Sequence, residues 1–168
     1  YTPLIFLILI TILSYWRSLS HQFVWDDQPL ILENPHIRKI ENIPSFFFPH
    51  YWKYIHPGTK GQYRPLRTVS LALSYHLWQF RPFGYHLTSL ILHILSVLLV
   101  YLVVVKLFKR PKTAFLTSLL FALHPAHVES VSWIKNQTDL FAMVFFLLSL
   151  AFYLKYLPAG SSLPSSKT

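Results

Sequence analysis

The sequence is 168 residues long, 53% hydrophobic and 12% charged, with a formal net charge of +9. Soluble domains carry about 25% charged residues, so this composition favours a membrane protein over a soluble one. The sequence contains no cysteine, which excludes disulfides and thiolate metal sites within these residues.

The first element is an almost purely hydrocarbon run over residues 3–13. It is shorter than the roughly 20 apolar residues that cross a bilayer as a helix. Because the sequence opens on Tyr1 rather than Met, we expect a span over residues 1–16 whose beginning lies before this sequence. A cleaved signal peptide would look similar, but this run lacks a basic leader and a small-residue cleavage site.

Two adjacent carboxylates, Asp26 and Asp27, follow shortly after this run. The whole sequence holds only six acidic residues, and an acid at a membrane boundary is a functional-site candidate. The alternative is that the pair only solvates a loop at the membrane surface.

The segment over residues 17–83 is too long for a simple connector. Turns are predicted at residues 26–29 and 33–35, because residues before proline disfavour helix, and residues 45–50 form a hydrophobic patch. An amphipathic helix is predicted over residues 66–80 from apolar side chains spaced three and four apart, Leu66, Val69, Leu73, Leu77 and Phe80. Its other face carries Arg67, Ser70, Ser74 and His76. We expect its apolar side to rest on the membrane surface.

Three more hydrophobic segments, at residues 84–108, 113–124 and 139–157, complete a prediction of about four membrane spans. The short link between the second and third spans is basic, with Lys106, Lys109, Arg110 and Lys112. By the positive-inside rule this link is cytoplasmic, which places the 17–83 loop and all six acids outside. A nucleic-acid groove would interleave basic and aromatic residues on one face. Here the basic cluster anchors topology, and we expect no nucleic-acid partner.

A second polar motif, His124-Pro125-Ala126-His127-Val128-Glu129, lies where the third span meets the outer face. Pro125 predicts a turn and a new helix, with His127 and Glu129 pointing inward near the depth of the aspartates. Two histidines at this spacing lack a third defined ligand. We therefore favour a histidine pair that caps the end of the span, and consider a metal site the less favoured alternative. Asp139, at the start of the fourth span, could serve simply as a helix cap.

These patterns predict an all-α membrane protein: a polytopic bundle of about four transmembrane helices over residues 1–157, with a long external loop that contains amphipathic interfacial helices. Residues 158–168 are rich in Ser, Pro and Gly, which is typical of a disordered tail.

Several motifs occur in the order found in one family: Phe23-Val24-Trp25-Asp26-Asp27, Asn34-Pro35, Tyr63-Arg64-Pro65-Leu66, Pro82-Phe83-Gly84-Tyr85-His86, Leu92-His93 and the stretch from Leu120 to Ile134. They resemble the amino-terminal membrane half of the transmembrane-and-tetratricopeptide-repeat O-mannosyltransferases and their bacterial relatives, which are GT-C glycosyltransferases. The resemblance extends to about residue 156. Gln137 and Thr138 stand where family members often carry a basic residue. The family's later spans and repeats are not in these residues, so we expect this fragment alone to be inactive.

The resemblance implies transfer of a sugar from a polyprenyl-phosphate donor to a hydroxyl of a protein or glycan acceptor. The reaction would occur on the extracytoplasmic side of the bacterial inner membrane or the endoplasmic reticulum. A carboxylate must take the acceptor's proton, and we expect Asp26 to be this base, with Asp27 positioning the acceptor or a metal. No cofactor is certain, and whether a divalent metal takes part stays open.

The leaving phosphate needs a fixed cation, and Arg64 and Arg67 are the expected contacts, unless they only snorkel to lipid headgroups. His124, His127, Glu129 and Asp139 are expected to line the same cavity. Two other functions stay open, a noncatalytic membrane scaffold or subunit and an ion or proton transporter. A transporter should bury charges in mid-span, and these spans hold almost none.

Overall fold

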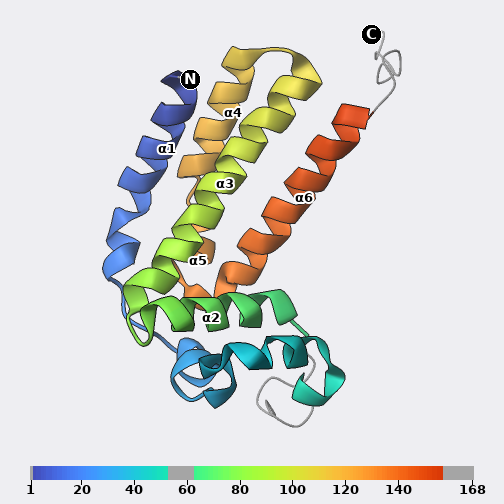
Figure 1. Ribbon diagram of the computed structural model, residues 1–168. Helices are drawn as coiled ribbons and strands as arrows, with labels where there is room; N and C mark the ends of the chain where they lie inside the picture. Colours follow the sequence, from blue (N-terminus) through green and yellow to red (C-terminus); the bar gives the residue numbers. More distant parts are fainter. Residues whose placement is uncertain (1, 53–62, 157–168) are drawn as a thin grey trace.

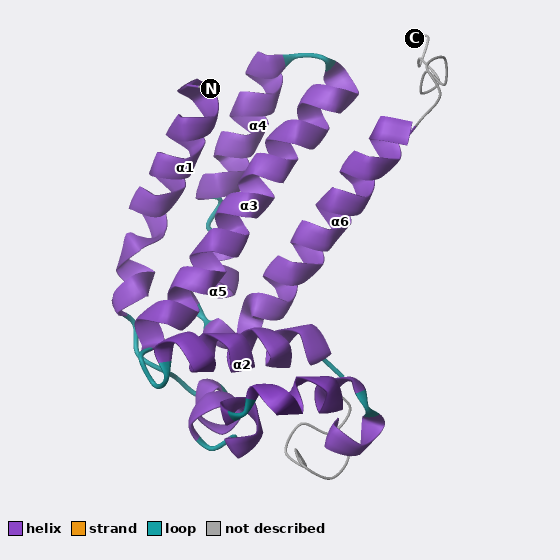
Figure 2. Cartoon of the chain, viewed as in Figure 1, coloured by secondary structure: helices purple, strands orange, loops and turns teal. Residues whose placement is uncertain are grey.

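The computed structural model describes residues 2–52 and 63–156, and every regular element in these ranges is helical (Figure 2). The α-helices are α1 (Thr2–Tyr15), α2 (Pro65–Trp78), α3 (Pro82–Phe108), α4 (Pro111–Leu123), α5 (His127–Ser132) and α6 (Gln137–Tyr156). Shorter 3₁₀ or π turns cover Trp16–Ser20, Gln28–Leu32, Pro35–Arg38, Ile40–Phe47 and Ile134–Asn136. The predicted all-α class is confirmed. The predicted tail, residues 158–168, lies outside the described residues.

Helix α3 is the centre of the bundle. In Figure 1, α1, α3, α4 and α6 run lengthwise, α2 lies across one end, and the short helices before α2 fold beyond it. Helix α3 contacts α1, α2, α4, α5 and α6. Its main core with α6 consists of buried aliphatic side chains, among them Leu92, Leu99, Val103, Leu140, Val144 and Leu147.

Proline sets the helix boundaries. Pro65, Pro82 and Pro111 occupy the first turns of α2, α3 and α4, where the missing N–H is one that a helix leaves unpaired anyway. Helix α3 ends at Phe108, and the next residue, Lys109, adopts the left-handed conformation with φ of 56°. Helix α4 stops two residues before Pro125. The chain therefore turns sharply at both ends of α4.

Three helical stretches are long and apolar enough to cross a membrane: Thr2–Ser20, Pro82–Phe108 and Ile134–Tyr156. They correspond to the first, second and fourth predicted spans. The third predicted span, residues 113–124, is α4, which has only 13 residues. At 1.5 Å per residue such a helix is roughly 20 Å long, shorter than the roughly 30 Å hydrocarbon core. The flanking prolines explain why this apolar segment does not extend further.

The predicted amphipathic helix is confirmed as α2, and three of the four residues of its predicted polar side are buried. Arg67, Ser70 and Ser74 are buried beside Leu71 and Ala72, whereas His76 and the leucines of the predicted apolar side, Leu66, Leu73 and Leu77, are exposed. A helix in a water-soluble protein would bury these three leucines instead. An exposed apolar face is what the predicted interfacial position requires.

Gln137 fixes α2 against the bundle. Its side chain is fully buried. Its Nε2 donates to the Tyr85 carbonyl oxygen (3.0 Å) and to Ser89 Oγ (3.2 Å). Its Oε1 accepts a hydrogen bond from Ser70 Oγ (3.0 Å). One side chain at the start of α6 thus ties α2 and α3 together.

Charge is distributed unevenly along the bundle. Four acidic residues precede α2, Glu129 lies in α5, and Asp139 lies in the first turn of α6. These segments gather at the α2 end, whereas the basic link between α3 and α4 lies at the opposite end (Figure 1). The acidic residues and the basic link are thus separated by the length of α3.

Candidate active site

Asp26 and Asp27 lie in a tight turn. The Asp27 N–H donates to the Val24 carbonyl (2.9 Å), and the Gln28 N–H donates to the Trp25 carbonyl (3.1 Å). Trp25 has a positive φ of 47°, which is uncommon for a bulky residue. The turn lies close to the one predicted at residues 26–29, and it leads directly into the single helical turn at Gln28–Leu32. It directs the two carboxylates into different environments.

Asp27 is buried, and both of its oxygens accept hydrogen bonds from the backbone. The Val24 N–H lies 3.2 Å from Oδ2, and the Lys135 N–H lies 3.1 Å from Oδ1. Burial raises the pKa of Asp27 to about 6, although the two backbone bonds lower it and the charge of Asp26 raises it further. This carboxyl group holds the turn against the connection between α5 and α6.

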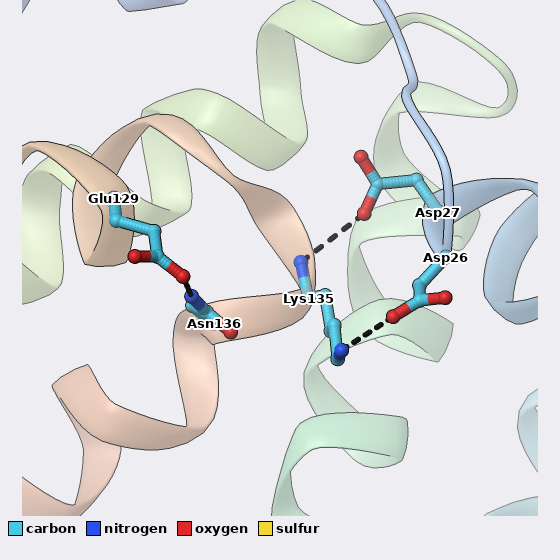
Figure 3. A network of polar contacts seen from close by, with 5 residues as sticks. All are labelled: Asp26, Asp27, Glu129, Lys135 and Asn136. Carbon is cyan, nitrogen blue, oxygen red and sulfur yellow. Dashed lines mark hydrogen bonds and ion pairs between the residues drawn. The ribbon is translucent and has the colours of Figure 1, made fainter. Parts of the chain in front are cut away.

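Asp26 is half-exposed and forms an ion pair with Lys135 Nζ (Figure 3). The same Nζ lies 4.6 Å from the centroid of the Trp133 ring. The second oxygen of Asp26, Oδ1, accepts no hydrogen bond from the described residues. Asp26 is therefore the carboxylate of the pair with an oxygen available to a substrate.

Lys135 was missed by the sequence reasoning. It lies 108 positions from Asp27 along the chain, so no local pattern links them. One signal was available: Lys135 is the only lysine or arginine between Lys112 and Lys155. An isolated cation in the same outer loop as Glu129 and Asp139 was a candidate partner for the aspartates.

Arg64 and Arg67, the predicted phosphate contacts, both line a pocket of about 320 Å³ between the start of α2 and α6. We call this pocket the arginine pocket. Arg67 is buried, and its Nε and Nη2 have no hydrogen-bond partner among the described residues. Burial lowers the pKa of Arg67 to about 10; Arg64 lowers it too, whereas Tyr51 and Asp26 raise it. Arg67 is therefore a buried cation at neutral pH within electrostatic reach of Asp26.

The opposite wall of this pocket contains Thr138, whose hydroxyl is buried without a partner among the described residues. A second pocket, of about 350 Å³, adjoins the first and shares Leu66, Phe141 and Phe145 with it. Its further lining is largely apolar and includes the exposed face of α2 and Ile91 of α3. A cationic pocket thus continues into an apolar groove.

His127, one of the predicted cavity residues, packs against aromatic rings, with ring centroids 4.4 Å from Phe121 and 5.2 Å from His93. Burial lowers the pKa of His127, and the charge of His124 acts in the same direction. His124 is exposed, and its Nδ1 accepts a hydrogen bond from the Ala126 N–H (3.2 Å). Protonation of His127 is therefore less favourable than that of a solvent-exposed histidine.

Glu129 is exposed and accepts a hydrogen bond from Asn136 Nδ2 (3.0 Å), away from the aspartate pair (Figure 3). Asp139 is exposed in the first turn of α6, and Thr138 rather than Asp139 lines the arginine pocket. Among the residues that the structure describes, no three His, Asp or Glu side chains come together as a metal-binding group. The cavity roles of these residues stay predictions.

The profile of the dolichyl-phosphate-mannose-protein mannosyltransferase family matches residues 60–163. Human protein O-mannosyl-transferase TMTC3 is 34% identical over 141 residues, which are 83% of this chain and 15% of that protein. Mouse protein O-mannosyl-transferase TMTC1 is 37% identical over 152 residues, or 88% of this chain and 16% of that protein. The chain thus spans about a sixth of the length of these relatives. No solved structure matches it.

Proposed function

Because the chain belongs to the dolichyl-phosphate-mannose-protein mannosyltransferase family, we propose that it is part of a membrane glycosyltransferase. The proposed reaction moves mannose from a polyprenyl-phosphate donor to a hydroxyl group of a protein acceptor. The relatives that it matches are named protein O-mannosyl-transferases, which supports the sugar and the acceptor class.

The observation that carries the proposal is the arginine pocket and the apolar groove that continues from it. A polyprenyl-phosphate sugar is an amphiphile with an anionic phosphate at one end of a hydrocarbon chain. Arg67 offers two unpartnered nitrogen atoms to the phosphate, and a planar guanidinium suits phosphate oxygens. The groove along α2, α3 and α6 offers apolar surface to the chain. Arg67 is buried and Arg64 is half-buried, which makes Arg67 the stronger candidate for the contact with the phosphate.

The tight turn over residues 24–28, which we call the aspartate turn, supplies the carboxylate that the reaction requires. The acceptor oxygen attacks the anomeric carbon, the bond from that carbon to the phosphate oxygen breaks, and the acceptor's proton passes to a carboxylate. Asp26 fits this last role because its Oδ1 is available and the group is half-exposed. The negative charge that develops on the leaving phosphate is stabilised by the arginine. Asp27, buried and hydrogen-bonded to the backbone, holds the turn that presents Asp26.

The proposed reaction takes place on the extracytoplasmic side. The link between α3 and α4 is short and rich in lysine and arginine, which is typical of cytoplasmic loops. The aspartate turn lies at the other end of the bundle (Figure 1) and would then face outward.

Donor binding to the full-length protein tests this function. Arg67→Met should weaken the binding of a polyprenyl-phosphate mannose by about 10- to 100-fold, the scale of a lost hydrogen bond to a charged group. Arg67→Lys keeps the charge but loses the paired planar contact, so it should bind at an intermediate level. An uncharged polyprenol should bind wild type and variants alike, because only the apolar groove would hold it.

The matched control is Arg81→Met, because Arg81 is exposed at the start of α3 and outside the arginine pocket. Its donor affinity should equal that of the wild type. Unchanged donor affinity in both Arg67→Met and Arg67→Lys would rule out Arg67 as the phosphate contact.

A further inference from the structure

Residues 133 and 135, in the connection between α5 and α6, contact the aspartate turn. The family match assigns no role to these contacts. Lys135 Nζ pairs with Asp26, and the Lys135 N–H donates to Asp27 Oδ1 (3.1 Å). The rings of Trp25 and Trp133 also meet edge to face, with centroids 5.8 Å apart. Two segments far apart in sequence therefore meet at the two carboxylates (Figure 3).

These contacts divide into two kinds. The bond from the Lys135 backbone to Asp27 would survive any substitution at position 135 except proline. The ion pair with Asp26 depends on a cation at this position, and the side chain of Lys135 is only 23% exposed, so solvent screens it less than a surface pair. The Trp133 ring beneath Nζ, at 4.6 Å, further limits where the ammonium can lie. The side chain thus has a defined position over Asp26.

We propose that Lys135 is a positioning residue that orients the Asp26 carboxylate for the transfer reaction. This inference rests on the proposed function, in which Asp26 is the base. A carboxylate that takes the acceptor's proton has to present a free oxygen at a fixed position. Fixing one oxygen of Asp26 on Nζ also directs the other, Oδ1, towards the acceptor.

The other charged groups near Asp26 are Asp27 beside it and the buried Arg67 on α2. Without Lys135, Asp26 would keep only Arg67 as a nearby cation among the described residues and would still face Asp27. Neither group would hold the orientation of the Asp26 carboxylate. The consequence is a lower transfer rate with donor affinity unchanged.

The test compares Lys135→Met, Lys135→Gln and Lys135→Arg in the full-length protein, with kcat for mannose transfer and donor affinity measured for each. The Met and Gln variants should lose about 100-fold in kcat, the scale of a misplaced catalytic group, and their donor affinity should equal that of the wild type. Lys135→Arg, which keeps the cation, should restore the rate.

Lys39→Met is the matched control, because Lys39 is an exposed lysine before α2 that lies outside this network. It should leave the rate unchanged. A wild-type kcat in the Met and Gln variants would overturn the inference, and so would a Lys135→Arg variant as impaired as Lys135→Met.

Hydrogen exchange separates this inference from the proposed function. Backbone amides of residues 24–28 should exchange faster in Lys135→Met than in the wild type, whatever reaction the protein catalyses. A wild-type protein with no mannose transfer would contradict the proposed function, whereas unchanged exchange in Lys135→Met would contradict the link between Lys135 and the turn.

Discussion

The two adjacent aspartates differ in every property that bears on catalysis. Asp27 is buried with both oxygens bonded to backbone N–H groups, and Asp26 is half-exposed and paired with Lys135. The sequence could identify the pair as unusual, because acids are rare in this chain and these two follow a membrane segment. It could not separate their roles for two reasons. Lys135, which contacts both aspartates, lies far along the chain. The direction of each carboxylate is set by the tight turn.

Asp27 should make stability depend on pH in a defined direction. Its pKa is about 6 in the folded protein against 3.8 for a solvated aspartate, so the folded form holds a proton that the unfolded chain releases between these values. The free energy of unfolding should therefore fall as pH rises from about 4 to about 6, by up to about 3 kcal/mol. Thermal unfolding in detergent, followed by circular dichroism at several pH values, measures this.

Asp27→Asn is the comparison for this prediction, since asparagine does not titrate. Its unfolding temperature should vary less between pH 4 and pH 6 than that of the wild type. An equal pH dependence in both proteins would mean that other groups are responsible.

At the scale of elements, the apolar period of three and four residues was enough to predict α2. The prolines in the first turns of α2, α3 and α4 are a further signal in the sequence for where these helices begin. Which face of α2 is buried could not be read from that pattern, because lipid and protein interior both accept leucine. The sequence predicted α4 with nearly its observed bounds, 113–124 against Pro111–Leu123. Pro111 and Pro125 confine it to fewer residues than the roughly 20 that cross a bilayer as a helix. Gln137 looked like a departure from the family motif, yet it is the hydrogen-bonding centre of three helices.

Gln137→Leu should destabilise the packing of α2 on α3 and α6. Leucine has a similar size but leaves Ser70 without its partner and removes both bonds to α3, which should cost about 1–3 kcal/mol in unfolding free energy. Adding Ser70→Ala should cost less in this variant than in the wild type, because the two residues share one bond. Denaturation of the four proteins in detergent measures the coupling.

Gln22→Leu is the control, because Gln22 is exposed in the loop before the aspartate turn. It should change stability little. Additive effects of Gln137→Leu and Ser70→Ala would contradict the role of this hydrogen bond.

At the scale of the whole molecule, the two ends of the bundle differ in charge. The α3–α4 link is purely basic, and the α2 end carries all six acids. Hydropathy and charge were sufficient to predict this polarity, because the positive-inside rule reads it directly from loop composition. How the α5–α6 connection meets the first loop lay beyond sequence reasoning, since it depends on packing between segments over 100 positions apart.

This polarity predicts the orientation in the membrane. In a full-length protein whose other cysteines are replaced, Glu41→Cys should react with an impermeant thiol reagent added outside the cytoplasm. Lys109→Cys should react only after the membrane is permeabilised. Labelling of Lys109→Cys from outside would place the aspartate turn on the cytoplasmic side and contradict the proposed site of reaction.

The most direct measurement is mannose transfer by full-length Asp26→Asn. Asparagine keeps the shape of the side chain but cannot take the acceptor's proton. The account predicts transfer lowered about 100-fold or more, the usual scale for a general base, with donor affinity and protein abundance equal to those of the wild type. Transfer at the wild-type rate by a normally inserted Asp26→Asn protein would contradict it and would leave Asp26 as a residue that only solvates the loop.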